Sequence, residues 1–287
     1  MKKTLVAALI SSVILLTGCQ DKDAEAKIKQ LNQTVAQLSA ENTKLKDQIE
    51  KTIPAIFVEN DEIFNQSEII KHPKSKEDYQ PEETKIEYSI STIKTNIDWL
   101  NDLLWKKLTE NEEKKNISRE QFVARYQTAF DEDKKKAKET PSFGISHSIW
   151  TNFIGQKEKL ATFAISFYDY EGGAHGIEGN RYFTIDLTTR HILTLNDLFN
   201  EKDLPKVKTL LWEQYNNSNK EYEPLIGVDS FNLSNNIYLD SKGVHFIYDV
   251  YEIAPYAAGE QDLLLYFGQL EELFRPEFKR NNYVKLL

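Results

Sequence analysis

The sequence contains a single cysteine, Cys19, among 287 residues. One thiol excludes a disulfide within the chain, a zinc site built from several cysteines and dithiol redox chemistry. Hydrophobic residues make up 40% of the chain and aromatic residues 11%, which is typical of a globular protein. The globular part must therefore be held together by packing alone.

The sequence also has fewer basic than acidic residues. It contains 36 Lys and Arg residues and 45 Asp and Glu residues, which gives a net charge of −9. A protein that binds nucleic acid needs a basic face, so nucleic acid is not expected as a partner. An acidic surface favours the approach of a basic protein or a cation. The alternative is that acidity of this size only keeps the protein soluble.

Catalytic motifs are missing as well. The sequence has no G-x-S-x-G elbow and no H-E-x-x-H pair. The glycine-rich segment at residues 172–176 leads into a predicted strand and lacks a following Lys-Ser/Thr, which excludes a phosphate-binding P-loop. Asp169, Glu171 and His175 match no standard metal-ligand spacing. The sequence thus predicts no enzyme, no catalytic residue, no cofactor and no metal. A cell-wall hydrolase using Glu171 and His175 is the less favoured alternative.

What the sequence does contain begins with an export signal. Lys2 and Lys3 precede an apolar run, Leu5 to Leu16, that is too short to span a bilayer. The run ends in Leu16-Thr17-Gly18-Cys19, which resembles the lipobox of bacterial lipoproteins. That resemblance implies cleavage before Cys19 and lipid attachment to its thiol. Gln20, in the place where lipoproteins of the inner membrane often carry Asp, favours the outer membrane. We therefore expect a membrane-anchored lipoprotein that faces the periplasm.

The next segment, residues 24–51, has no glycine or proline and predicts a continuous helix. Seven residues repeat at alternating spacings of three and four, which is the a/d seam of a coiled coil: Ile28, Leu31, Val35, Leu38, Asn42, Leu45 and Ile49. A buried Asn42 at an a position favours a parallel dimer. We expect a homo-oligomer through Ile28 to Ile49; the alternative is a spacer helix that packs on its own globular domain.

The remaining sequence predicts an α+β fold. Residues 53–83 contain His72-Pro73 and Gln80-Pro81 and indicate a poorly ordered tether. Strand-like alternation begins at Ile86, Tyr88 and Ile90. Two helices follow, the first capped by Asn96 and the second by a capping box of Ser118 and Gln121.

After Pro141 the pattern changes to strands. The predicted strands are Phe143–Phe153, Leu160–Tyr170, Arg181–Leu187 and Asp262–Phe267, with a helix at Leu204–Tyr215. A hairpin joins residues 231–239 to residues 244–250, with Gly243 expected to supply a positive φ. The predicted fold class is α+β, a mostly antiparallel sheet with a few packed helices, preceded by an N-terminal coiled-coil helix.

Two loops carry the candidate ligand-binding residues. The loop at residues 168–176 contains Glu171 and His175, and the loop at residues 251–259 contains Tyr251, Glu252 and Tyr256. Tyrosines on loops often form contact surfaces, because they offer large area at low entropic cost. The alternative is that both loops are structural turns folded onto the sheet.

These loops and the strands between them resemble the C-terminal domain of the RsiV-like family. The matching pieces are Phe167-Tyr168-Asp169-Tyr170, Gly172-Gly173-Ala174-His175-Gly176, the strand at residues 182–187, Leu193 to Phe199, and the loop at residues 251–259. Ile86 to Leu108 is similar to the companion N-terminal module of that family. The resemblance implies an extracytoplasmic α+β binding domain and, for some members, a lysozyme partner.

The chain departs from the anti-sigma factors of that family, because it has no cytoplasmic sigma-binding region and no spanning helix. It also lacks the metal motif of the family's peptidoglycan deacetylases. The sequence therefore predicts a non-enzymatic envelope lipoprotein that binds a protein, with lysozyme as a candidate, or a cell-wall ligand. The alternative is a structural spacer associated with peptidoglycan. The expected order is signal peptide 1–18, coiled-coil stalk 19–52, linker 53–83, N-terminal RsiV-like module 84–139 and C-terminal RsiV-like domain 140–287.

Overall fold

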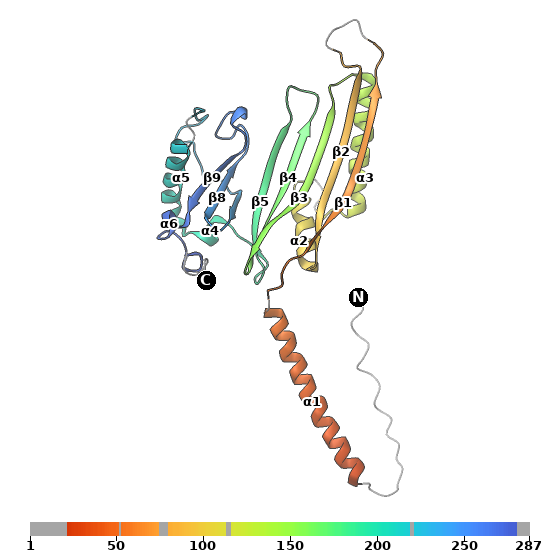
Figure 1. Cartoon of the computed structure of the whole chain (residues 1–287), viewed down its shortest axis with the longest axis vertical. Helices are drawn as coiled ribbons and strands as arrows, with labels where there is room; N and C mark the ends of the chain where they lie inside the picture. Colours follow the sequence, from red (N-terminus) through yellow and green to blue (C-terminus); the bar gives the residue numbers. More distant parts are fainter. Residues whose placement is uncertain (1–21, 52, 75–79, 113–115, 219–220, 280–287) are drawn as a thin grey trace. The chain divides into compact units, whose positions relative to one another are not determined.

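The computed structural model describes residues 22–51, 53–74, 80–112, 116–218 and 221–279 (Figure 1). The predicted signal peptide and Cys19 lie outside these ranges. The chain divides into two compact units, residues 1–52 and residues 53–287. None of the described helices is long and apolar enough to cross a membrane.

The first unit contains helix α1, Lys22–Lys51, and confirms the predicted N-terminal helix. Its apolar seam residues Ile28, Leu31, Val35, Leu38 and Leu45 are between 49% and 63% exposed. Asn42 is exposed as well. The partner helix that this seam predicts stays a prediction.

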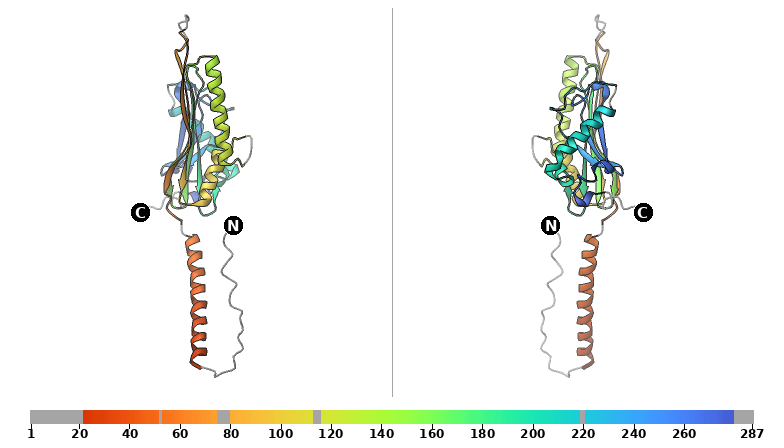
Figure 2. Two further views of the ribbon diagram at one scale, coloured as in Figure 1. Left: turned by 90° about the vertical axis from the view of Figure 1, so that its right-hand side faces the viewer. Right: turned by 90° about the vertical axis from the view of Figure 1, so that its left-hand side faces the viewer.

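The second unit is built on a six-stranded sheet with strand order β1-β2-β3-β4-β5-β6. Its strands are β1 Val58–Lys71, β2 Glu83–Thr95, β3 Ile145–Lys157, β4 Leu160–Tyr170, β5 Ile177–Asp186 and β6 His191–Ile192. All neighbours are antiparallel except β2 and β3. This parallel pair requires a long crossover. Helices α2, Asp98–Leu108, and α3, Arg119–Glu139, provide it and lie together on one face of the sheet (Figure 2).

Alternation along β2 explains why the helices pack on that face. Ile86, Tyr88 and Ile90 are buried and belong to the same hydrophobic core as Phe122 and Phe130 of α3. The rings of Tyr88 and Phe130 meet edge to face at 5.4 Å. The predicted strand is therefore confirmed. The predicted capping box is confirmed too, with reciprocal hydrogen bonds between Ser118 and Gln121.

A smaller antiparallel sheet follows in the order β7-β8-β9. Its strands are β7 Ile237–Leu239, β8 Gly243–Tyr248 and β9 Gln261–Tyr266. One face packs with helix α5, Leu204–Ser218, in a second core that contains Tyr215, Phe231 and Phe246. Short helices complete this part: α4 Leu195–Leu198, α6 Phe267–Leu270, and the 3-10 turns Glu201–Asp203, Tyr256–Ala258 and Pro276–Phe278. The predicted α+β class is confirmed.

The predicted linker over residues 53–83 is wrong, because these residues begin the second unit and residues 58–71 form β1. Phe64 and Ile70 are buried beneath α3, whereas most other β1 side chains are exposed. An edge strand with one covered face carries few apolar residues, which hid its alternation. The boundary predicted between residues 139 and 140 also has no counterpart, because β2 and β3 pair within one sheet.

Three smaller expectations are wrong as well. Asn96 does not cap α2, because the N-cap is Ile97. The side-chain amide of Asn96 instead accepts a hydrogen bond from the N–H of Phe57 and donates one to the carbonyl oxygen of Ala55. Gly243 is not among the residues with positive φ. A Cβ on Gly243 would lie 2.0 Å from the carbonyl oxygen of Leu265, so close approach of the chains requires glycine there. The first hairpin strand begins at Ile237, six residues later than predicted from residue 231.

Phe64→Ala tests whether β1 is part of the cooperative fold. Phe64 is 5% exposed, so we expect the substitution to lower the free energy of unfolding by about 3–5 kcal/mol. Ile69→Ala on the same strand is the control, since Ile69 is half exposed and should cost less than about 1 kcal/mol. Urea unfolding followed by circular dichroism measures both. Equal, small effects would show that β1 does not contribute to the core.

Candidate functional site

The two loops singled out in the sequence lie together. The loop between β4 and β5 contributes His175, whose ring stacks on Tyr256 of the loop between β8 and β9, with centroids 3.7 Å apart. The hydroxyl of Tyr251 lies 3.4 Å from Nε2 of His175. The Tyr256 hydroxyl donates to the carbonyl oxygen of Gly176 at 2.8 Å. We call His175, Tyr251 and Tyr256 the aromatic cluster.

Tyr251 stands out within this cluster. Its side chain is 54% exposed, and its backbone has φ 68°, a left-handed conformation that few residues with a Cβ adopt. Ile253 and Ala254, both buried, anchor the turn, and the Tyr251 N–H donates to the carbonyl oxygen of Ala254. The loop therefore holds an aromatic side chain in solvent at a cost in backbone strain, a feature that often accompanies binding sites.

Exposed apolar and acidic side chains lie close in the chain to residues of the aromatic cluster. Ile177, two residues after His175, is about half exposed. Leu225 is similarly exposed, and its N–H donates to the carbonyl oxygen of Ile253. Glu178 and Glu252 are exposed on the same two loop regions. This surface thus combines contact area with negative charge.

The predicted site residues do not all join this surface. Glu252 lies in the same turn as Tyr251, and its carboxylate accepts a hydrogen bond from the N–H of Asp249. The negative charge of Glu171 instead helps to raise the pKa values of Tyr88, Lys136 and His147. Lys136 belongs to α3, so Glu171 lies on the side of the sheet that faces this helix. The structure therefore joins His175, Tyr251 and Tyr256 through direct contacts, with Glu252 in the same turn as Tyr251. Among the described residues, no hydrogen bond or ring contact connects Glu171 to them. Their role in ligand binding stays a prediction.

The residues near Glu171 combine charge interactions with a ring contact, because the rings of Tyr88 and His147 meet edge to face at 4.7 Å. Nδ1 of His147 lies 2.7 Å from Oδ1 of Asp169, and this hydrogen bond raises the pKa of His147 against the opposing effect of burial. The Tyr88 hydroxyl donates to Asp133. Across the described ranges, no group of three or more His, Cys, Asp and Glu side chains could hold a metal ion.

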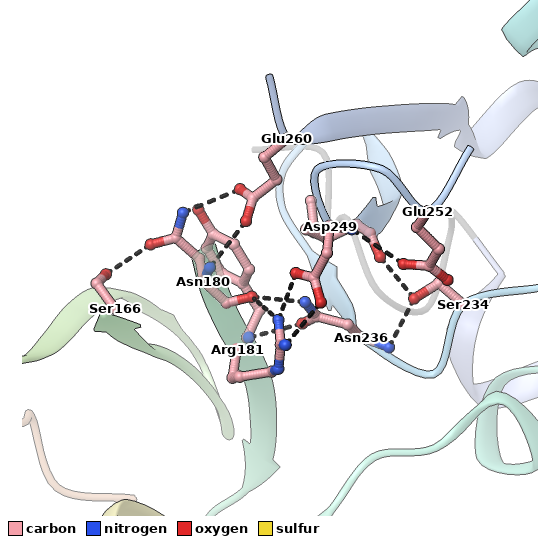
Figure 3. Close-up of polar contacts among 10 residues, drawn as sticks. Ser166, Asn180, Arg181, Ser234, Asn236, Asp249, Glu252 and Glu260 are labelled. Carbon is pink, nitrogen blue, oxygen red and sulfur yellow. Dashed lines mark hydrogen bonds and ion pairs between the residues drawn. The ribbon is translucent and has the colours of Figure 1, made fainter. Parts of the chain in front are cut away.

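A polar network connects β5 of the larger sheet with the chain around the smaller sheet (Figure 3). Arg181 of β5 makes two contacts of 2.6 Å with the carboxylate of Asp249, directly after β8. The N–H and the amide group of Asn180 donate to the two carboxylate oxygens of Glu260 at 2.8 and 2.9 Å. Burial raises the pKa of Glu260. Both loop ends are thereby tied to β5.

Asn236 completes this network. Its Oδ1 accepts from the N–H of Tyr182 at 2.7 Å, and its Nδ2 donates to the carbonyl oxygen of Asn180 at 2.6 Å. β6 pairs with β5 only at Ile185 and Asp186, so this stretch of the β5 edge is satisfied by side chains in place of a strand. An unpaired main-chain group at that position would be costly.

Sequence reasoning missed the residues of this network. Arg181 is the first residue of the predicted strand Arg181–Leu187, and Asn180 directly precedes it. Asp249 lies near the end of the predicted strand at residues 244–250. In the structure, Asn236 and Glu260 lie outside the strands. Their only signal was polar side chains at strand ends, which is also typical of solvated turns.

Asn236→Ala tests this junction. Removing the amide leaves the N–H of Tyr182 without a partner and takes one of two donors from the Asn180 carbonyl oxygen, so we expect a loss of about 1–3 kcal/mol in the free energy of unfolding. Asn232→Ala is the matched control, because Asn232 is exposed and makes one local bond to Ser230. Urea titration measures both, and a loss for Asn236→Ala no larger than the control would contradict the assignment.

Comparison with known proteins finds a family model that matches part of the chain. Residues 196–267 match the model described as "Protein of unknown function (DUF3298)". No curated protein matches the chain. Among solved structures, the chain is similar to a DUF3298 member from Bacteroides fragilis NCTC 9343, with TM-score 0.55 and 20% identity over 80% of this chain and 98% of that chain. It is also similar to a DUF3298 protein from Pseudomonas aeruginosa PAO1, with TM-score 0.54 and 19% identity over 78% and 96%.

The matched residues include the tyrosine loop and begin after the glycine-rich loop. At these identities the two structures show a shared fold and nothing about function. Residues 196–267 thus match the DUF3298 family model, and the chain shares its fold with two solved DUF3298 proteins.

Proposed function

We propose that this protein is a non-enzymatic component of the cell envelope that binds a protein ligand through the aromatic cluster. The observation that carries the proposal is the exposed Tyr251, held in a left-handed backbone next to His175 and Tyr256. Aromatic anchors that are fixed before binding lose little entropy when a partner docks. The network of Asn180, Arg181 and Asp249 supplies that rigidity.

The charge around the cluster favours a basic ligand. Glu178 and Glu252 are exposed beside it, Arg181 is already paired with Asp249, and the whole chain has a net charge of −9. Complementary charge speeds association and selects the partner. Together with the resemblance to the RsiV-like family, this makes lysozyme, a basic protein, the candidate ligand.

The location that we propose rests on the sequence. Acylation of Cys19 would anchor the mature chain in a bilayer, with the outer membrane favoured by Gln20. A ligand that reaches the envelope from outside would then meet the domain on the periplasmic side. Peptidoglycan is the alternative ligand at that location.

Tyr251→Asn tests the binding surface. Asparagine tolerates the left-handed backbone, so the substitution removes the ring and leaves the turn intact. We expect at least a tenfold loss of affinity for hen egg-white lysozyme in isothermal titration calorimetry at low salt, as expected for an interface anchor. Higher salt should weaken binding of the unsubstituted protein.

Tyr266→Asn is the matched control, because Tyr266 is also about half exposed but lies at the end of β9. It should bind lysozyme as the unsubstituted protein does. Absence of lysozyme binding by the unsubstituted protein at low salt would exclude lysozyme. Equal affinities of the two variants would remove the aromatic cluster from the interface.

The exposed seam of α1 favours a second role, a coiled-coil spacer. Five large apolar side chains lie in solvent along one helix, which an isolated helix does not stabilise. Leu38→Asp at a d position should dissociate an oligomer in sedimentation velocity, whereas Gln33→Asp, outside the seam, should not. A monomeric unsubstituted chain at high concentration would contradict this role.

A further inference from the structure

The second face of the six-stranded sheet, opposite α2 and α3, carries mainly small polar side chains around its middle strands, with Glu62 of β1 opposite Ser91. Strand side chains alternate between the two faces of a sheet. Five side chains near the middle of β2 and β3 on this face are partly or fully exposed. They are Ser89, Ser91, Ser148, Trp150 and Asn152. Lys85 and Glu87, the nearest charges on β2, neutralise each other in an ion pair of 2.6 Å.

Trp150 is the exceptional residue of this face. It is 38% exposed, and strand pairing places it between Ser91 and Ser166. The other three tryptophans, Trp99, Trp105 and Trp212, pack against the two hydrophobic cores. Within the described residues, Trp150 makes no ring stacking, no cation–π contact and no indole hydrogen bond.

A chain of hydrogen bonds fixes the orientation of the amide next to Trp150. Glu260 accepts from Asn180, Oδ1 of Asn180 accepts from the Ser166 hydroxyl at 2.6 Å, and Oγ of Ser166 accepts from Nδ2 of Asn152 at 3.0 Å. Nδ2 of Asn152 is thus engaged. Its Oδ1 has no partner among the described residues and is not one of the buried unsatisfied atoms, so it can accept a hydrogen bond from a ligand.

We propose that this face binds a neutral glycan, with a sugar ring stacked on the indole of Trp150 and a sugar hydroxyl donating to Oδ1 of Asn152. The C–H face of a pyranose is apolar and flat, and it fits an exposed aromatic plane, while its rim of hydroxyls requires polar groups around that plane. The neutral serines and Asn152 meet this requirement without charge. A nucleic acid would require a basic face. This glycan surface goes beyond the protein-binding role of the aromatic cluster and does not depend on it.

The experiment is a titration of the full chain with chitohexaose, a neutral β-linked hexasaccharide, followed by tryptophan fluorescence and isothermal titration calorimetry. We expect saturable binding and a blue shift of the emission. Trp150→Ala should lower affinity at least tenfold, Trp150→Phe should retain part of it, and Asn152→Ala should lower it several-fold. Binding should change little between low and high salt, because the hexasaccharide carries no charge.

Phe143→Ala is the matched control, since Phe143 is also exposed but precedes β3. It should bind like the unsubstituted protein, and thermal melting should show that every variant is folded. Failure of the unsubstituted chain to bind the hexasaccharide at millimolar concentration would overturn the proposal, as would equal affinity of Trp150→Ala. Lysozyme binding by Trp150→Ala and sugar binding by Tyr251→Asn keep this result separate from the test of the aromatic cluster.

Discussion

The edge of β5 is the constraint on which the second unit depends. Most neighbouring strands in this protein satisfy their main-chain groups by pairing, but β5 meets the smaller sheet through the side chains of Asn236 and Glu260. An amide and a carboxylate can each satisfy two groups, so two side chains replace a stretch of strand. The two sheets are therefore joined without a continuous ladder of main-chain hydrogen bonds. The loop before β5 and the loop before β9 come into contact at this junction.

The same junction connects the two proposed surfaces. Glu260 ends the hydrogen-bond chain that orients Asn152, and it directly follows the loop that presents Tyr251 and Tyr256. The sheet face that carries Trp150 and the loop that carries the aromatic cluster are therefore both connected to the half-buried carboxylate of Glu260. Burial disfavours its charged form, and the two donors of Asn180 compensate for that cost in part.

Elements whose residues alternate or repeat strongly could be predicted from the sequence. The helix at residues 22–51, the strand containing Ile86 and the Ser118 capping box follow from local patterns, and the structure confirms them. β1 could not be recognised, because an edge strand needs only a few apolar contacts such as Phe64. The ring stacking of His175 on Tyr256 joins positions that are 81 residues apart in the chain. Sequence resemblance suggested both loops, but the contacts between them arise only in the tertiary fold.

The parallel pairing of β2 with β3 has a consequence for how the chain reaches this structure. β1 and β2 are complete long before β3 is made, since residues 96–144 intervene. Before β3 is made, only α2 and α3 can cover the apolar face of Ile86, Tyr88 and Ile90. The pairing of β2 with β3 at the centre of the sheet cannot yet form. Closing so long a loop slows folding and prolongs the exposure of unpaired strand edges. During that interval the charged residues along β1 discourage pairing between molecules.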